Sequence, residues 1–182
     1  MKKLLSLIFS FCAIILFAAC DDKTETFDDQ WKLANETQFA NIIASTVQGY
    51  KRIDSQSKNG YIMYKEIKSG NGETPYFTDK VKVLYTGWFK YDWTKDDTYT
   101  DNRGQTIYNK KIFSATNSNV PYTLGVNSFI DGFTTALQHM QEGDKWEIWI
   151  PWNLGYGASE NTSGNIPAYT TLVFEIELVG II

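Results

Sequence analysis

Apolar and polar residues alternate along two stretches near the end of the chain. The first, "KWEIWIP", covers residues 145–151, and the second, "LVFEIELVG", covers residues 172–180. A period of two residues is typical of β-strands with one buried face. The buried faces are predicted to carry Trp146, Ile148 and Ile150 in the first strand and Phe174, Ile176 and Leu178 in the second. Glu175 and Glu177 are expected on the solvated face of the second strand.

The loop between these two strands is too long for a simple hairpin turn. Within it, Tyr156 stands between Gly155 and Gly157, where the backbone can bend freely. A loop tyrosine in that setting has little core to fill. We therefore expect it to contribute to a binding pocket.

Further strands are predicted at residues 60–68, 79–87 and 120–125. Residues 88–112 are polar and aromatic with no clean period, and they predict a long excursion from the sheet that carries a hairpin of its own. Its purpose is left open by the residue pattern.

Two segments have helical spacing. In residues 129–144 one stripe contains Phe129, Phe133, Ala136, Leu137 and Met140, and Gly143 is predicted to cap the helix. In residues 31–50 the apolar positions are Trp31, Ala34, Phe39, Ile42, Ile43 and Val47. We favour a helix that packs on the domain there, and the alternative is a dimerisation arm. The whole pattern predicts an α+β fold in which antiparallel strands wrap around one short helix.

The N-terminus resembles a bacterial lipoprotein signal. Lys2 and Lys3 precede an apolar run that ends in "LFAAC" at Cys20. The organisation predicted is a signal peptide at 1–19, a lipidated Cys20 with a flexible tether at 20–30, a helical segment at 31–59 and one domain at 60–182. The acidic start "CDD" resembles surface-exported lipoproteins of the Bacteroidetes. The alternative is an ordinary signal peptide with an incidental cysteine.

Composition narrows the possible partners. The chain has 182 residues, a formal net charge of −4 and a single histidine, His139. The acidic balance argues against nucleic acid as a partner, and the lack of a Cys/His cluster makes a zinc site improbable. A mature domain would have no thiol, since Cys12 lies in the signal segment. Membrane attachment would then depend on the lipid anchor, with the outer membrane as the expected location and the leaflet open.

Three separated blocks share one family resemblance. They are "VKVLYTGW", "LGVNSFIDGFTTALQHMQEGDKWEIWIP" and "LGYGAS…IPAYTTLVFEIELVG", and their order and spacing resemble FKBP-type peptidyl-prolyl cis-trans isomerases. The resemblance implies a twisted antiparallel sheet around a short helix, with a pocket for a prolyl peptide between them. It implies no metal or cofactor.

The resemblance also assigns roles to residues of this chain. Tyr85, Phe113 and Tyr156 match the catalytic pocket positions, with the Tyr156 hydroxyl donating to the carbonyl beside the prolyl bond. The matching substrate-binding positions are Tyr122, Ile130, Phe133, Ile166 and Phe174, of which Ile130 acts through its backbone N–H. Packing in the core is the alternative role for Tyr85, Phe133 and Phe174.

Several positions depart from the family pattern. Phe133 stands where a tryptophan usually forms the pocket floor, and Ser114 stands where active members usually have an aspartate. Asn165 replaces an apolar residue beside Ile166. These changes bear on activity and on the binding of macrolide ligands more than on the fold.

The favoured interpretation is a lipid-anchored prolyl isomerase that assists the folding of exported, proline-containing polypeptides. A second is a non-catalytic FKBP-like peptide-binding module, favoured by Ser114 and Phe133. A third is a structural lipoprotein whose aromatic excursion contacts a partner. The oligomeric state is open.

Overall fold

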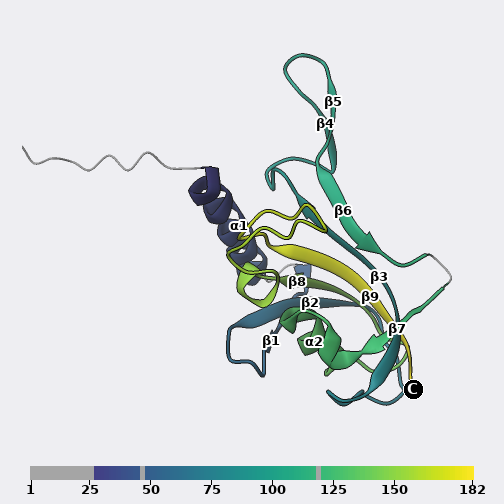
Figure 1. Ribbon diagram of the computed structural model, residues 1–182. Helices are drawn as coiled ribbons and strands as arrows, with labels where there is room; N and C mark the ends of the chain where they lie inside the picture. The colour runs from purple at the N-terminus through teal and green to yellow at the C-terminus, as the bar shows by residue number, and fades with distance from the viewer. Residues whose placement is uncertain (1–26, 46–47, 118–119) are drawn as a thin grey trace, which may run out of the picture.

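The computed structural model of the protein describes residues 27–45, 48–117 and 120–182 (Figure 1). The predicted signal peptide, Cys20 and most of the predicted tether lie outside the described residues. The helices are α1 (Phe27–Ala44) and α2 (Asp131–Leu137), with short 3₁₀ helices η2 (Val126–Ser128) and η3 (Trp152–Leu154). The strands are β1 (Lys51–Asp54), β2 (Tyr61–Lys68), β3 (Lys80–Lys90), β4 (Thr98–Thr100), β5 (Thr106–Tyr108), β6 (Lys110–Ala115), β7 (Tyr122–Gly125), β8 (Lys145–Ile150) and β9 (Leu172–Ile181).

Seven strands form one antiparallel sheet in the order β1-β2-β8-β9-β3-β6, with β7 also paired to β3. The sheet curves around α2, which lies against its concave face (Figure 1). The predicted α+β class is therefore confirmed, as are the strands expected at 60–68, 79–87, 120–125, 145–151 and 172–180, within one to three residues at most ends. The largest difference is at the strand expected at 79–87, which continues to Lys90 as β3.

The main core lies between α2 and the concave face of the sheet. Phe133, Ala136 and Leu137 of α2 are almost fully buried there, against apolar side chains of β3, β8 and β9. Helix and sheet approach closely at Gly132, where an added Cβ would collide with the Ile150 side chain. The glycine thus lets α2 sit deep in the curve of the sheet.

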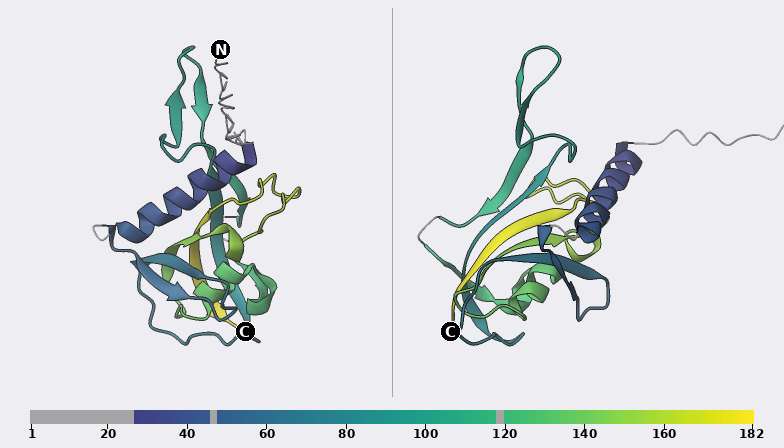
Figure 2. Two further views of the ribbon diagram at one scale, coloured as in Figure 1. Left: turned by 90° about the vertical axis from the view of Figure 1, so that its left-hand side faces the viewer. Right: turned by 180° about the vertical axis from the view of Figure 1, so that it is seen from behind.

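Helix α1 covers part of the opposite face of the sheet, at the end farther from the C-terminus (Figure 2). Phe39 and Ile42 pack there against Met63, Trp149 and Val173 in a second buried cluster. This contact explains why Trp149 is 9% exposed although it alternates with the residues of the main core. The packing on the domain that we expected for this helix is therefore present.

Buried hydrogen bonds also hold α1 in place. The Trp31 indole N–H donates to Thr170 Oγ1 at 3.1 Å. The fully buried Asn35 side chain accepts from the Thr171 N–H at 2.9 Å and from the Trp93 indole N–H at 3.1 Å. Since an unsatisfied buried amide is costly, these partners fix the helix both to the segment just before β9 and to the excursion.

Three boundary predictions near α1 and α2 are wrong. Residues 27–30, predicted as tether, belong to α1, whose first turn carries Asp28 and Asp29, because acidic side chains favour the N-terminal end of a helix dipole. Residues 51–54, predicted within the helical segment, form the edge strand β1, which is mostly exposed and so lacks an apolar signature. Gly143 does not cap α2, which ends at Leu137. It lies at φ +92° in the turn before β8, where its N–H donates to Leu178 O at 2.8 Å.

The excursion contains the expected hairpin, β4–β5, which projects away from the sheet (Figures 1 and 2). Its base is closed by Asn109, which is fully buried. The Asn109 amide donates to the carbonyls of Asp92, Asp96 and Lys95 at 2.7, 2.9 and 3.2 Å, and its oxygen accepts from the Asp92 N–H at 2.8 Å. One side chain thus joins both ends of the segment.

In the part of the chain that the structure describes, neither helix has the length and apolar character needed to cross a membrane.

Candidate functional site

A small aromatic pocket opens between the start of α2 and the concave face of the sheet. Its volume is about 70 Å³. Its walls come from β3, β6, β9, the start of α2 and the loop after η3, and they consist of Tyr85, Phe113, Ser114, Phe129, Ile130, Phe133, Tyr156 and Phe174. Segments far apart in the sequence therefore meet at one site.

A β-bulge brings two consecutive residues of β6 into this pocket. Ser114 pairs with Gly87 and Ile112 pairs with Trp88, so Phe113 between them has no partner on β3. The extra residue of a bulge re-aims the neighbouring side chains, which otherwise alternate between the two faces. Phe113 and Ser114 both line the pocket for this reason.

The pocket floor is built from aromatic rings in edge contacts. The Phe133 ring lies 5.2 Å from Phe174 at 90° and 5.6 Å from Tyr85 at 81°. Phe129 stacks on Phe133 at 4.4 Å. Phe133 is 1% exposed among these rings and lines the pocket at the position where the family pattern usually has a tryptophan.

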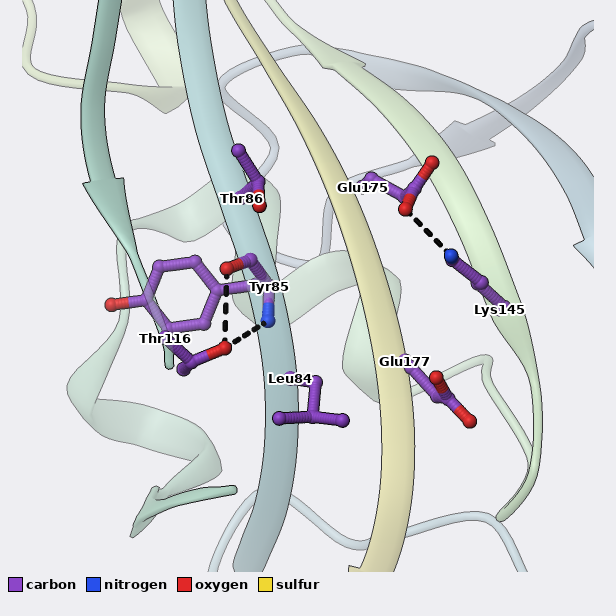
Figure 3. Close-up of a pocket in the computed structure, with 7 residues that line it drawn as sticks. All are labelled: Leu84, Tyr85, Thr86, Thr116, Lys145, Glu175 and Glu177. Carbon is purple, nitrogen blue, oxygen red and sulfur yellow. Dashed lines mark hydrogen bonds and ion pairs between the residues drawn. The ribbon is translucent and has the colours of Figure 1, made fainter. Parts of the chain in front are cut away.

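Tyr85 is fixed through both its hydroxyl and its backbone. Its hydroxyl shares a hydrogen bond of 3.0 Å with Ser114 Oγ, so the serine that replaces the usual aspartate keeps a polar contact with this tyrosine. Thr116, the residue after β6, holds the backbone: its Oγ1 accepts from the Tyr85 N–H at 3.0 Å and donates to the Tyr85 carbonyl at 3.3 Å (Figure 3). The sequence pattern did not predict this contact between Thr116 and Tyr85.

Tyr156 stands at the mouth of the pocket with 39% of its surface exposed. Its loop is held by hydrogen bonds from the Gly157 N–H to Trp152 O and from the Tyr169 N–H to Gly157 O, both 2.9 Å long. Burial raises the pKa of the Tyr156 phenol, and the nearby Tyr85 adds to the effect. The hydroxyl therefore stays protonated, and among the described residues none accepts its hydrogen bond.

Ile130 is the N-cap residue of α2. Its carbonyl accepts from the Thr134 N–H at 3.0 Å, while its own N–H precedes the helix and has no partner within it. Ile130 also lines the pocket.

The structure brings six of the proposed site residues together in the pocket: Tyr85, Phe113, Ile130, Phe133, Tyr156 and Phe174. Ile166 is instead fully buried in the main core, bridged to Asn161. Tyr122 is 50% exposed on β7, at the edge of the sheet, and does not line the pocket. Phe129 does, although the sequence analysis placed it only on the apolar helical stripe. Asn165 has φ +48°, a conformation that asparagine tolerates better than the usual apolar residue.

The opposite face of the sheet carries charges that lie away from the pocket. Figure 3 shows Glu175 and Glu177 on β9, with the Tyr85 ring extending away from both. Glu175 pairs with Lys145 at 2.6 Å and Glu177 with Lys68 at 3.8 Å. Both glutamates are partly exposed, which agrees with the solvated role predicted for them. The described residues contain no group of three or more His, Cys, Asp or Glu side chains placed to hold a metal ion.

The chain thus combines a curved antiparallel sheet around a short helix with an aromatic pocket between the two. A family model described as FKBP-type peptidyl-prolyl cis-trans isomerase matches residues 72–179. The chain belongs to this family.

Relatives from several organisms have similar sequences. The chain is 35% identical over 121 residues to the macrophage infectivity potentiator of Trypanosoma cruzi and 32% identical over 164 residues to FkpA, an FKBP-type isomerase of Aeromonas hydrophila. These alignments cover 66% and 90% of this chain and 53% of each relative, so the chain spans about half the length of both. It is also 32% identical to an FK506-binding protein of Neisseria meningitidis, with 66% of this chain and 95% of that protein covered.

Solved structures agree with this assignment. A peptidyl-prolyl cis-trans isomerase of Pseudomonas syringae superposes with a TM-score of 0.63 at 28% identity, over 87% of this chain and 98% of the other. FkpA of Escherichia coli superposes with a TM-score of 0.57 at 25% identity, over 85% of this chain and 62% of the other.

Proposed function

We propose that this protein is a peptidyl-prolyl cis-trans isomerase acting on exported polypeptides. The observation that carries the proposal is that Tyr156, which has a donor hydroxyl, and Ile130, whose N–H precedes α2, both line a pocket walled by aromatic rings. The rings suit a proline side chain, and the donors suit the carbonyl beside it.

The reaction requires rotation about one bond. Resonance in the peptide link gives a barrier of roughly 18–20 kcal/mol, and before proline the cis and trans forms differ little in energy. The planar amide carries more charge separation than the twisted one, so an apolar pocket disfavours the planar forms relative to the transition state. Phe113, Phe133 and Phe174 provide such surroundings, while Tyr156 and Ile130 hold the carbonyl in a fixed orientation.

A protease-coupled isomerisation assay on a short Xaa-Pro peptide tests the proposal. Loss of the donor in Tyr156→Phe is expected to lower kcat/KM about 2–10-fold, the range for one hydrogen bond. Phe113→Ala is expected to lower it further, because a wall of the pocket is removed. Tyr122→Phe makes the same chemical change outside the pocket and serves as the control, with no change expected. A rate with the wild-type protein equal to the uncatalysed rate would contradict the proposal.

A non-catalytic peptide-binding module is the second candidate. Ser114 favours it, since a neutral hydroxyl occupies the place of the usual pocket carboxylate. Titration of a proline-containing peptide, together with the isomerisation assay, separates the two candidates, because the module would bind the peptide without accelerating its isomerisation. FK506 is a second probe of the same pocket, since macrolide ligands are expected to compete with the peptide.

The proposed location is the cell envelope, with a lipid on Cys20 anchoring the protein to the outer membrane. The support is the "LFAAC" sequence after an apolar run, which lies outside the described residues. The test is membrane fractionation of cells that express each variant. Cys20→Ser is expected to release the protein from membranes, whereas Cys12→Ser should leave it attached. Retention of the Cys20 variant on membranes would contradict the anchor.

A further inference from the structure

Helix α1 reaches the pocket through a chain of three aromatic rings. The Trp31 ring meets Phe89 edge-on, with centroids 6.2 Å apart and planes at 82°. Phe89 in turn lies 6.3 Å from Phe113, with the two planes only 30° apart. Trp31 therefore contacts Phe89, which lies behind the pocket residue Phe113. Trp31 itself lies outside residues 72–179, which match the family model.

The first two rings of this series, Trp31 and Phe89, are closely confined. Phe89 is fully buried and Trp31 is 7% exposed, in the same core cluster as Phe133 and Phe174. The indole N–H of Trp31 is fixed to Thr170 Oγ1 at 3.1 Å. Densely packed cores transmit displacement, so a gap at Trp31 would be filled in part by movement of Phe89.

Phe113 is the ring of the three that has room to change its orientation. It is the bulge residue of β6 and has no partner on β3, so its ring is held mainly by neighbouring side chains. Those neighbours are Phe89, Phe174 at 5.4 Å and Tyr156 at 6.4 Å. Removing support on the Phe89 side would leave Phe113 free to tilt out of the position that contacts a proline ring.

We infer that Trp31 is a positioning residue for the isomerase reaction and acts through Phe89 on Phe113. Helix α1 is then part of the catalytic unit, beyond its role in covering the sheet. The inference rests on the proposed function, because the isomerisation rate is the first measurement that tests it.

The test compares two substitutions in the same helix. Trp31→Ala removes the ring behind Phe89, whereas Phe39→Ala removes a comparable buried ring from the second cluster, on the other face of the sheet. Each variant is assayed well below its own unfolding midpoint, so loss of stability alone does not lower the rate. Trp31→Ala is expected to lower kcat/KM at least fivefold with most of the loss in kcat, and Phe39→Ala to stay within twofold of the wild type.

A conservative variant and a spectroscopic measurement complete the design. Trp31→Phe keeps a ring against Phe89 and is expected to recover most of the rate. Should Trp31→Ala not fold, Trp31→Leu takes its place, because it removes the ring but keeps an apolar side chain in the core. Ring resonances of Phe113 in protein labelled with ¹³C-phenylalanine, assigned from Phe113→Leu, are expected to shift with Trp31→Ala and not with Phe39→Ala.

Equal losses in Trp31→Ala and Phe39→Ala, or unmoved Phe113 resonances, would overturn the inference. Absence of any wild-type rate would instead refute the proposed function. The resonances would still decide whether Trp31 positions Phe113.

Discussion

Gly87 is the position where one added methyl group should damage both the fold and the site. It lies on β3 opposite Ser114 and Phe174. A Cβ there would lie 2.5 and 2.8 Å from two carbons of the Phe174 ring and 2.9 Å from Phe113 Cζ. Real Cβ atoms are almost never that close to another atom, so both rings must move.

The size of the effect follows from how easily each ring can move. Phe174 is 4% exposed and packed against Phe133 at 5.2 Å, so it has little freedom. Phe113 is half-buried and can tilt outward. Overpacking of this kind costs about 1–3 kcal/mol, and at roughly 2–4 °C per kcal/mol the melting temperature of Gly87→Ala should fall by about 2–12 °C.

The assays are thermal denaturation and the protease-coupled isomerisation rate. We expect kcat/KM of Gly87→Ala to fall about tenfold or more at a temperature where the variant is folded, since Phe174 and Phe113, which both line the pocket, are displaced. Gly180→Ala is the matched control, because a Cβ at that strand position would meet only Glu142 Oε1 at an ordinary 3.6 Å. Equal stability and equal activity in Gly87→Ala and Gly180→Ala would contradict the predicted displacement of the rings.

Two further predictions concern stability. Asn109→Leu removes the four hydrogen bonds at the base of the excursion and should lower the free energy of unfolding, measured by urea titration, by about 2–4 kcal/mol. Amide exchange in residues 92–97 should become faster. A change no larger than that of Asn127→Leu, at an exposed site, would contradict this prediction. The second concerns alkaline pH: burial, followed by the hydrogen bond to Glu147, raises the pKa of Tyr50, and burial raises that of Tyr156. The unfolded chain then loses these protons first, so stability should be constant up to about pH 9 and fall above about pH 10. Tyr50→Phe should weaken that fall, and an unchanged pH dependence in this variant would show that Tyr50 is not its source.

Most of the sheet could be predicted because its strands bury one face and expose the other. β8 and β9 have a clear period of two, and their burial follows it, apart from Trp149 and Val173. Those two residues are buried because α1 packs on the second face of the sheet. A period in one strand cannot report what a distant helix covers.

The pocket could be predicted in outline and not in detail. Tyr156 stood out because a tyrosine between two glycines has no other evident use. The bulge that turns Phe113 and Ser114 inward depends on the register between β3 and β6, which no local pattern encodes. Thr116 was missed for a similar reason, since its contacts are with the backbone of a strand 31 residues away.

The closed base of the excursion makes the β4–β5 hairpin a convenient attachment point on this protein. Contacts at Asn109 separate the hairpin from the sheet, and its tip is an independent turn in which Asp101 accepts hydrogen bonds from the Arg103 and Gln105 N–H groups at 2.9 and 2.8 Å. Exposed tips of this kind tolerate insertions well. A short peptide tag, a fluorophore or a cross-linker placed at the tip could therefore capture polypeptides during turnover without altering the chain's ends or its core.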